Sequence, residues 1–218
     1  LICLKSMLYD YLEDQNCKVS KICLGTMTFG EQTSKAESLK IFEICKESGK
    51  PFRMLPSVND IISGGLGLAG FRPFIHSFGV FTYRRPYDQL VASIAYPKRK
   101  ARIMGFLPGI TTPGGMTHQA IEDISVMRTL PNMTVLETGD ATEVESICEA
   151  ADSIDGPVYC RMLRGSVPRL FNTPIKVGEI RTLSDGDDIT IFTSGICTEE
   201  AIRARSALVK FGVSLKHI

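Results

Sequence analysis

Between Ile61 and Met162, short apolar runs alternate with longer segments whose apolar residues recur at helical spacing. Strands that alternate with helices in this way form βαβ crossovers, and the strands of such units pair in parallel. A parallel sheet is covered by helices on both faces, so its strands are continuously apolar rather than alternating. The sequence therefore predicts an α/β fold with a parallel sheet and helices on both faces.

The expected elements of this region follow from the apolar pattern and from capping residues. The segment Asp140-Ala-Thr-Glu143 matches a capping box, in which a side-chain oxygen accepts a bond from the N–H three residues later. Other helices are expected at 61–68, 86–96 and 118–130, and strands from 71–74 onward and at 101–107, 133–137 and 157–162. The residues expected to face the core from two of the helices are Ile121, Ile124 and Met127, and Val144, Ile147, Cys148 and Ala151.

After Pro174 the alternation starts again. A strand at 187–193, a helix at 198–211 and a strand at 213–218 predict the opening of a second α/β domain, truncated by the chain end. Residues 51–60 show no clear pattern and suggest a junction. The expected domains are therefore 1–55, 56–173 and 174–218.

The stretch from Gly105 to Gln119 is the best candidate for a ligand site. An expected strand enters a loop rich in glycine and proline, which closes on Thr117 and His118 where a helix is expected to begin. Open parallel sheets bind ligands at this kind of strand-to-helix loop. Glycines allow close backbone approach, and a helix start offers unpaired N–H groups.

Charge and hydropathy exclude several classes of protein. The chain has 25 basic and 24 acidic residues, so there is no basic surface of the kind that binds nucleic acid. The longest apolar stretch, 61–81, is interrupted by Arg72, His76 and several glycines, which argues against a membrane span. No targeting segment is apparent.

The seven cysteines form no C-x-x-C pair and have no histidine at ligand spacing. A structural zinc site and a disulfide framework are therefore not expected, and no metal ligand is assigned. Free cysteines indicate a reducing, cytoplasmic setting.

Residues 18–49 read as one βα unit, a short strand and loop followed by a helix with a capping box at 34–37. Within it, Cys23-Leu-Gly-Thr-Met-Thr-Phe-Gly-Glu-Gln32 resembles the first barrel strand of an aldo/keto reductase. The resemblance stops after about forty residues, without the Asp and Tyr that the family would place next. One unit of an eight-unit barrel cannot assemble that active site.

From about Gly65 onward the chain resembles the C-terminal half of the transketolase family. The sequence motifs that carry the resemblance are Gly70-Phe-Arg-Pro-Phe-Ile-His-Ser-Phe-Gly-Val-Phe81, Gly114-Gly-Met-Thr-His-Gln-Ala-Ile-Glu-Asp123, Leu130-Pro-Asn-Met-Thr134 and Asp155-Gly-Pro-Val-Tyr159. They occur in the family's order and spacing. The resemblance implies a pyrimidine-binding domain followed by the start of the C-terminal transketolase domain.

In that family thiamine diphosphate lies between subunits. A diphosphate-binding domain holds the magnesium and phosphates, and the pyrimidine domain of a partner holds the aminopyrimidine ring. The resemblance implies that Phe78 and Phe81 line this ring, that His118 lies near the substrate hydroxyls and that Arg164 lies near the substrate phosphate. Without the resemblance, these residues would be read as core phenylalanines, a helix-cap histidine and a surface ion pair.

One departure from the family concerns catalysis. The family uses a Glu before its Gly-rich helix to protonate the pyrimidine ring, and here that position falls near Pro56. Asp60 lies several residues later and is one methylene shorter. The Gly-Asp-Gly…Asn magnesium motif is also missing, so no catalytic residue is assigned.

The sequence thus predicts the pyrimidine-binding half of a ketol transferase, inactive alone, that acts on sugar phosphates. It would need a diphosphate-binding subunit or a homodimer, with thiamine diphosphate and magnesium held jointly. One alternative is a non-catalytic interaction module or a gene-fusion product. An NADPH-dependent aldo/keto reductase rests on residues 18–49 alone.

Overall fold

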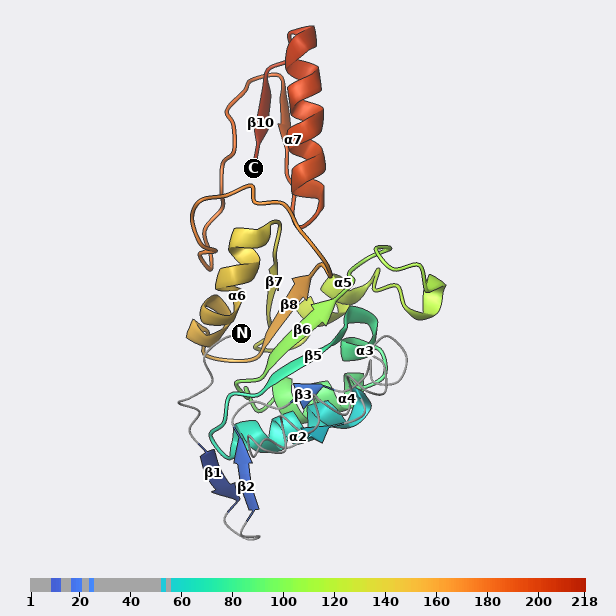
Figure 1. Cartoon of the computed structure of the whole chain (residues 1–218), viewed down its shortest axis with the longest axis vertical. Coiled ribbons are helices and arrows are strands. Elements are labelled where there is room, and N and C mark those ends of the chain that lie inside the picture. The colour runs from blue at the N-terminus through green and yellow to red at the C-terminus, as the bar shows by residue number, and fades with distance from the viewer. Residues whose placement is uncertain (1–8, 13–16, 21–23, 26–51, 54–55) are drawn as a thin grey trace.

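The computed structural model describes residues 9–12, 17–20, 24–25, 52–53 and 56–218 (Figure 1). The strand and loop expected at 18–30 lie partly, and the helix expected from Ser34 to Gly49 wholly, outside these residues. Two small strand pairs precede the continuous part. β1 (Tyr9–Leu12) pairs antiparallel with β2 (Cys17–Ser20), and β3 (Leu24–Gly25) pairs in parallel with β4 (Phe52–Arg53).

The central element is a four-stranded sheet in the order β5-β6-β8-β7. Its strands are β5 (Phe74–Phe78), β6 (Arg102–Phe106), β8 (Val158–Met162) and β7 (Thr134–Glu137). Every neighbouring pair is parallel, so the carboxyl ends of all four strands meet at one edge. The predicted parallel sheet is confirmed.

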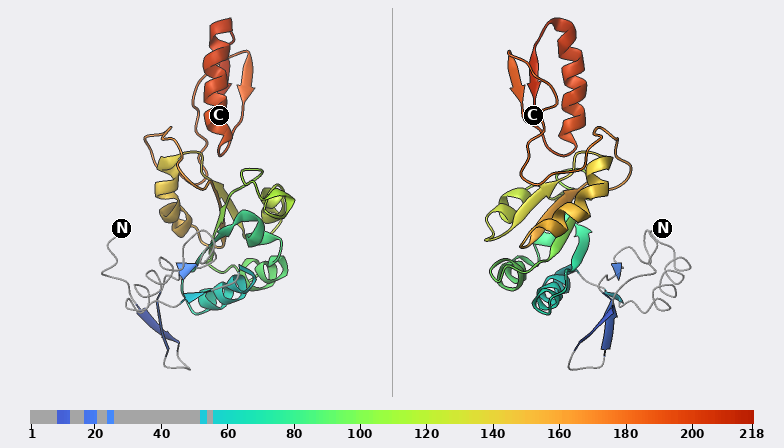
Figure 2. Two further views of the ribbon diagram at one scale, coloured as in Figure 1. Left: turned by 45° about the vertical axis from the view of Figure 1, so that its right-hand side comes forward. Right: turned by 90° about the vertical axis from the view of Figure 1, so that its left-hand side faces the viewer.

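Helices cover both faces of this sheet. Successive strand residues point to opposite sides, so neighbouring residues of one strand pack in different layers. On one face, Ile103 packs in a core with residues of α3 (Gly79–Tyr83), η1 (Leu90–Ala95) and α5 (Asp123–Arg128). On the other face, Met104 packs against α6 (Ala141–Ser153). α2 (Pro56–Leu68) lies beside η1 and also contacts β5 and α3, in the same layer (Figure 2).

The helix predicted at 118–130 is much shorter in the structure, where only α5 is helical. The backbone of Ala120 exchanges two hydrogen bonds with Gly109, which holds the preceding residues in a loop. Ile121 is consequently 66% exposed rather than buried, whereas Met127 is fully buried as expected. The helix predicted at 86–96 consists of α4 (Tyr87–Gln89) followed by the π-helix η1.

The predicted cap of α6 is confirmed. The Asp140 carboxylate accepts a bond from Glu143 N at 2.8 Å, and the Glu143 carboxylate accepts one from Gly139 N at 2.9 Å. Ile147 and Ala151 are buried as expected. Cys148 is exposed, contrary to prediction, because it lies at the edge of the buried stripe.

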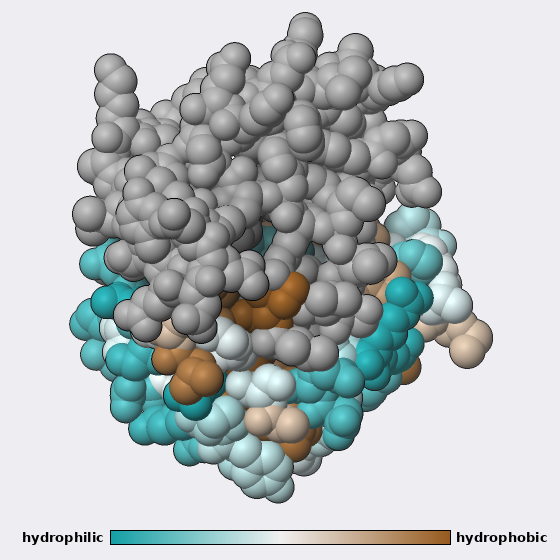
Figure 3. Space-filling view, turned by 90° about the horizontal axis from the view of Figure 1, so that it is seen from below, coloured by the Kyte–Doolittle hydropathy of each residue, from teal (hydrophilic) through white to brown (hydrophobic). Residues whose placement is uncertain are grey.

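The C-terminal part confirms the predicted strand–helix–strand order. β9 (Ile189–Ile191) pairs in parallel with β10 (Leu215–His217), and α7 (Cys197–Leu208) with the short η3 (Val209–Phe211) connects them. This unit extends away from the central sheet at the top of Figure 1. On the opposite, lower face, the described residues are mainly hydrophilic, with some apolar side chains near the middle (Figure 3).

Among the described residues, no helix is both long enough and apolar enough to cross a bilayer.

Candidate functional site

The carboxyl edge of the sheet gathers the residues that the sequence singled out. Phe78 is the last residue of β5, and α3 begins directly at Gly79 and carries Phe81 in its first turn. Gly79 is buried against the loop that follows β6, since a Cβ there would lie 3.2 Å from Ala120 Cβ. This close packing brings the loop residues next to the phenylalanines.

Phe78, Phe81 and His118 form one aromatic–histidine cluster. The two phenyl rings stack with centroids 5.9 Å apart and planes 18° apart. The His118 ring meets them edge-on, at 6.2 Å from Phe78 and 5.2 Å from Phe81. All three side chains are half-buried, so the phenylalanines border the core without being sealed inside it.

Two exposed arginines flank the cluster. The guanidinium carbon of Arg164 lies 5.8 Å from the Phe78 ring centroid, and that of Arg85 lies 4.7 Å from the Phe81 centroid. Aromatic rings with cations close by suit a flat heterocycle that carries anionic groups. Arg85 was not assigned from the sequence, although its place four residues after Phe81, on the turn that leaves α3, was the available signal.

His118 is placed by the loop between β6 and α5. The loop is closed at its base by Gly109 N to Ala120 O at 2.9 Å and Ala120 N to Gly109 O at 3.1 Å. His118 follows the short 3-10 helix η2 (Gly115–Thr117), and its Nδ1 lies 2.8 Å from Thr117 Oγ1. A Cβ on Gly114 would come within 2.7 Å of His118 Cβ, so glycine at 114 is needed for this placement.

A buried polar network beneath the loop was not predicted. Asp123, the first residue of α5, is fully buried and accepts bonds from Tyr159 Oη at 2.8 Å and Arg161 Nε at 2.9 Å. Arg161 also donates to Glu137. Burial lowers the pKa of Arg161, but the two carboxylates outweigh it and the net shift is upward. The sequence signal was an arginine inside an otherwise apolar strand.

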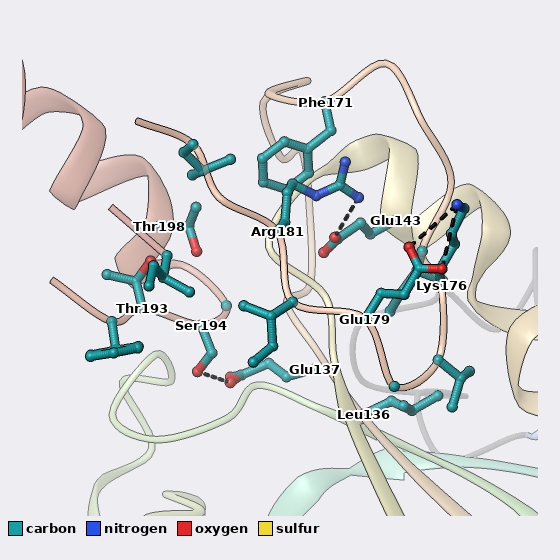
Figure 4. A pocket seen from close by; sticks show the side chains of 18 of the residues that line it. Leu136, Glu137, Glu143, Phe171, Lys176, Glu179, Arg181, Thr193, Ser194 and Thr198 are labelled. Carbon is teal, nitrogen blue, oxygen red and sulfur yellow. Dashed lines mark hydrogen bonds and ion pairs between the residues drawn. The ribbon is translucent and has the colours of Figure 1, made fainter. Parts of the chain in front are cut away.

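A second candidate is a cavity of about 400 Å³ between β7, α6 and the C-terminal segment (Figure 4). Arg181 lies on the Phe171 ring at 4.2 Å and within 3.4 Å of a Glu143 oxygen. On the other side, Ser194 Oγ donates to Glu137 at 2.6 Å. The charged side chains shown there are largely paired with each other, so the cavity offers fewer free groups than the sheet edge.

Comparison with known proteins identifies the domain that carries the sheet edge. The family model described as "Transketolase, pyrimidine binding domain" matches residues 62–169. Residues 62–169 belong to the transketolase family, as its pyrimidine-binding domain. The predicted family is therefore confirmed over the four-stranded sheet.

Curated relatives extend the match over the transketolase region. A transketolase family protein of Sinorhizobium fredii is 36% identical over 154 residues, which cover 69% of this chain and 45% of the relative. A 6-deoxy-6-sulfo-D-fructose transketolase subunit of a Clostridium species is 37% identical over 155 residues, or 70% of this chain and 48% of the relative. The chain thus spans about half the length of the curated relatives it matches.

Solved structures agree with this assignment. A structure described as a split gene transketolase, inactive beta4 tetramer, aligns with a TM-score of 0.75 and 30% identity over 90% of this chain and 64% of that one. A transketolase from Pichia stipitis aligns with a TM-score of 0.66 and 22% identity over 74% of this chain and 25% of that one, and shows the shared fold.

The activating Glu of the family is expected, from the sequence, near the start of α2. Pro56, which stands near the expected position of the activating Glu, is the first residue of α2. Proline suits a first helical turn but has no acid–base group. Within the described residues, no group of three or more His, Cys, Asp or Glu side chains is arranged to hold a metal ion.

Proposed function

We propose that this chain is the pyrimidine-binding half of a thiamine diphosphate-dependent ketol transferase. The observation that carries the proposal is the aromatic–histidine cluster at the carboxyl edge of the parallel sheet. The half-buried, stacked rings of Phe78 and Phe81 offer a flat apolar surface that fits an aminopyrimidine ring. When bound, thiamine diphosphate supplies the carbanion-stabilising chemistry, and the chain supplies binding and orientation.

The other side chains of the cluster fit a sugar phosphate substrate. His118 lies edge-on to the two rings, is half-buried and can exchange hydrogen bonds with hydroxyl groups. Arg164 carries a planar guanidinium that suits a phosphate group, and it stands beside Phe78. We therefore assign substrate binding to His118 and Arg164 and ring binding to Phe78 and Phe81.

We propose that a partner completes the site. The partner would be a subunit with a diphosphate-binding domain that holds magnesium, or a second copy in a dimer. Two observations support inactivity of the isolated chain. The segment around Pro56, near which the activating Glu is expected, holds no Glu, and the similar split-gene structure is described as an inactive tetramer. We further propose domains at 1–55, 56–173 and 174–218 and a cytoplasmic setting.

Isothermal titration with thiamine diphosphate and magnesium tests the proposal on three samples. The first is the chain alone, the second is the chain with a diphosphate-binding transketolase subunit, and the third is the Phe78→Ala variant of the chain with that subunit. We expect binding only in the second case, together with ketol transfer between sugar phosphates. Ketol transfer by the purified chain alone would overturn the proposed dependence on a partner.

A second candidate function is a non-catalytic interaction module or a fusion product, favoured by the absence of a Glu from the sequence around Pro56, near which the acid is expected. In that case the partner subunit would bind the chain and the cofactor, but ketol transfer would remain absent. If transfer is absent, replacing Pro56 by Glu tests the cause, because restored transfer would show that only the acid had been missing. NADPH oxidation with a carbonyl substrate would instead support the aldo/keto reductase resemblance, which lies largely outside the described residues.

A further inference from the structure

The buried network beneath the loop joins parts of the chain that are far apart in sequence. Arg161, near the carboxyl end of β8, donates from Nε to Asp123 at 2.9 Å and from Nη1 to Glu137. Its side chain is 15% exposed, Glu137 is 13% exposed and Asp123 is fully buried. One guanidinium therefore bridges α5 and β7 in a site where solvent screens little.

Arg161 also lies near both ends of the loop that carries His118. A Cβ on Gly109 would lie 3.6 Å from Arg161 Nη2, so the guanidinium is close to the start of the loop. Asp123 follows the end of the loop, three residues after Ala120. Gly109 and Ala120 are bonded to each other and close the base of the loop that carries His118.

The same network reaches the C-terminal segment through Glu137. Ser194 Oγ donates to Glu137 Oε2 at 2.6 Å (Figure 4), and Arg161 donates to the other oxygen of the same carboxylate. Gly195 has a φ of 58°, and a Cβ there would come within 2.5 Å of Glu137 Oε1. The segment after β9 is thus fitted closely onto this carboxylate.

We propose that Arg161 is a positioning residue for the His118 loop, and that Ser194 of the C-terminal segment acts on the loop through Glu137 and Arg161. Contact with Ser194 fixes the Glu137 carboxylate, which fixes the guanidinium and, through it, Gly109 and Asp123. The consequence for cofactor binding rests on the proposed function. The positioning itself is a property of the chain alone.

Hydrogen exchange of the Gly109 and Ala120 amides tests this on the full chain without ligand, because both amides close the base of the loop. In Arg161→Met we expect their exchange to accelerate at least tenfold relative to amides of α6. Arg161→Lys should be intermediate, because an ammonium group can meet one carboxylate but cannot reproduce the planar fork. A uniform acceleration across the domain, or none, would overturn the proposal.

Ser194→Ala tests the connection to the C-terminal segment. Because it leaves Arg161 in place, it also tests the proposal if Arg161→Met does not fold. We expect the same two amides to accelerate by about threefold in the parent chain but not in the Arg161→Lys background. Equal effects in both backgrounds would show that the two residues act independently.

Arg102→Met is the matched control. Arg102 is also a buried arginine, but it begins β6 at the opposite edge of the sheet. It should destabilise the domain without selectively accelerating Gly109 and Ala120. Since none of these measurements uses thiamine diphosphate, a failure of cofactor binding would refute the proposed function and leave the positioning role to be judged separately.

Discussion

At the scale of single residues, the sheet edge separates groups that face a ligand from groups that hold the fold. Phe78, Phe81 and His118 are half-buried and lie together, whereas Asp123 and Arg102 are fully buried and bonded within the chain. Substitution of the first group should change binding more than stability. Substitution of the second should do the reverse.

Phe81→Ala should weaken thiamine diphosphate binding by the complete assembly about tenfold, because stacking contributes roughly 1 kcal/mol beyond the area buried. Titration calorimetry measures this. The control is Tyr96→Ala, an aromatic residue that is 69% exposed and outside the cluster, for which we expect unchanged affinity. Equal losses in the two variants would contradict a stacking role for Phe81.

Arg102→Met should lower the free energy of unfolding by about 2–4 kcal/mol, because buried carbonyl groups lose a charged donor. Arg102 donates to Gly156 O at 2.7 Å and Ile154 O at 3.0 Å and so satisfies carbonyls of the turn that follows α6. Urea denaturation provides the measurement. A change below about 0.5 kcal/mol, the usual range for surface substitutions, would show that these bonds contribute little.

At the scale of elements, α6 is fixed at both ends by polar contacts. Asp140 caps its start, and its second oxygen accepts bonds from Leu170 N at 2.9 Å and Phe171 N at 2.8 Å. The cap therefore also holds the segment that follows β8. Burial alone raises the pKa of Asp140, but the backbone donors outweigh it and the net pKa is lowered.

Asp140→Ala should cost about 2 kcal/mol of unfolding free energy at neutral pH, since a cap and two further acceptor contacts are lost. Asp140→Asn isolates the charge. Because the folded pKa lies below the unfolded value of about 3.9, the stability due to ionisation is present above that pH and is lost on acidification through the folded pKa. The stability difference between the parent chain and Asp140→Asn should therefore shrink from about pH 5 to about pH 3. A constant difference in chemical denaturation would contradict this.

At the scale of the whole molecule, the C-terminal part exposes several large apolar side chains. Phe192 is 73% exposed and Phe211 is 82% exposed, and Ile189 on β9 is 46% exposed. Exposed apolar surface of this kind favours association.

The double variant Phe192→Ser, Phe211→Ser should reduce concentration-dependent self-association of the isolated chain, because two large apolar side chains are removed from water-exposed positions. Sedimentation velocity at several concentrations measures the change. Tyr96→Ser serves as the comparison, because it removes an exposed aromatic residue from the pyrimidine-binding domain. Equal reductions would show that no particular part of the surface is responsible.

Local sequence patterns were sufficient for most elements. The strands at 101–107, 133–137 and 157–162 are apolar runs, and α6 has a capping box, so neighbouring residues decide them. The helix expected at 118–130 failed because a distant pair of backbone bonds, between Gly109 and Ala120, competes with its first turn. Burial of Cys148 was predicted wrongly, because periodicity indicates which residues share a helix face but not how much of that face the neighbouring elements cover.

The sequence by itself determined the parallel sheet and the order of its elements. Its family motifs also single out Phe78, Phe81, His118 and Arg164. Only the tertiary structure decided that the first three meet at one edge, that Arg85 joins them and that Arg161 ties their loop to Ser194. The physical reason for this difference is the sequence separation of the residues that interact. Helical and strand periods act over neighbouring residues, whereas the bonds of Arg161 join residues 24 and 38 positions apart and that of Ser194 spans 57. Such contacts form only when parallel strands bring their carboxyl ends to the same edge.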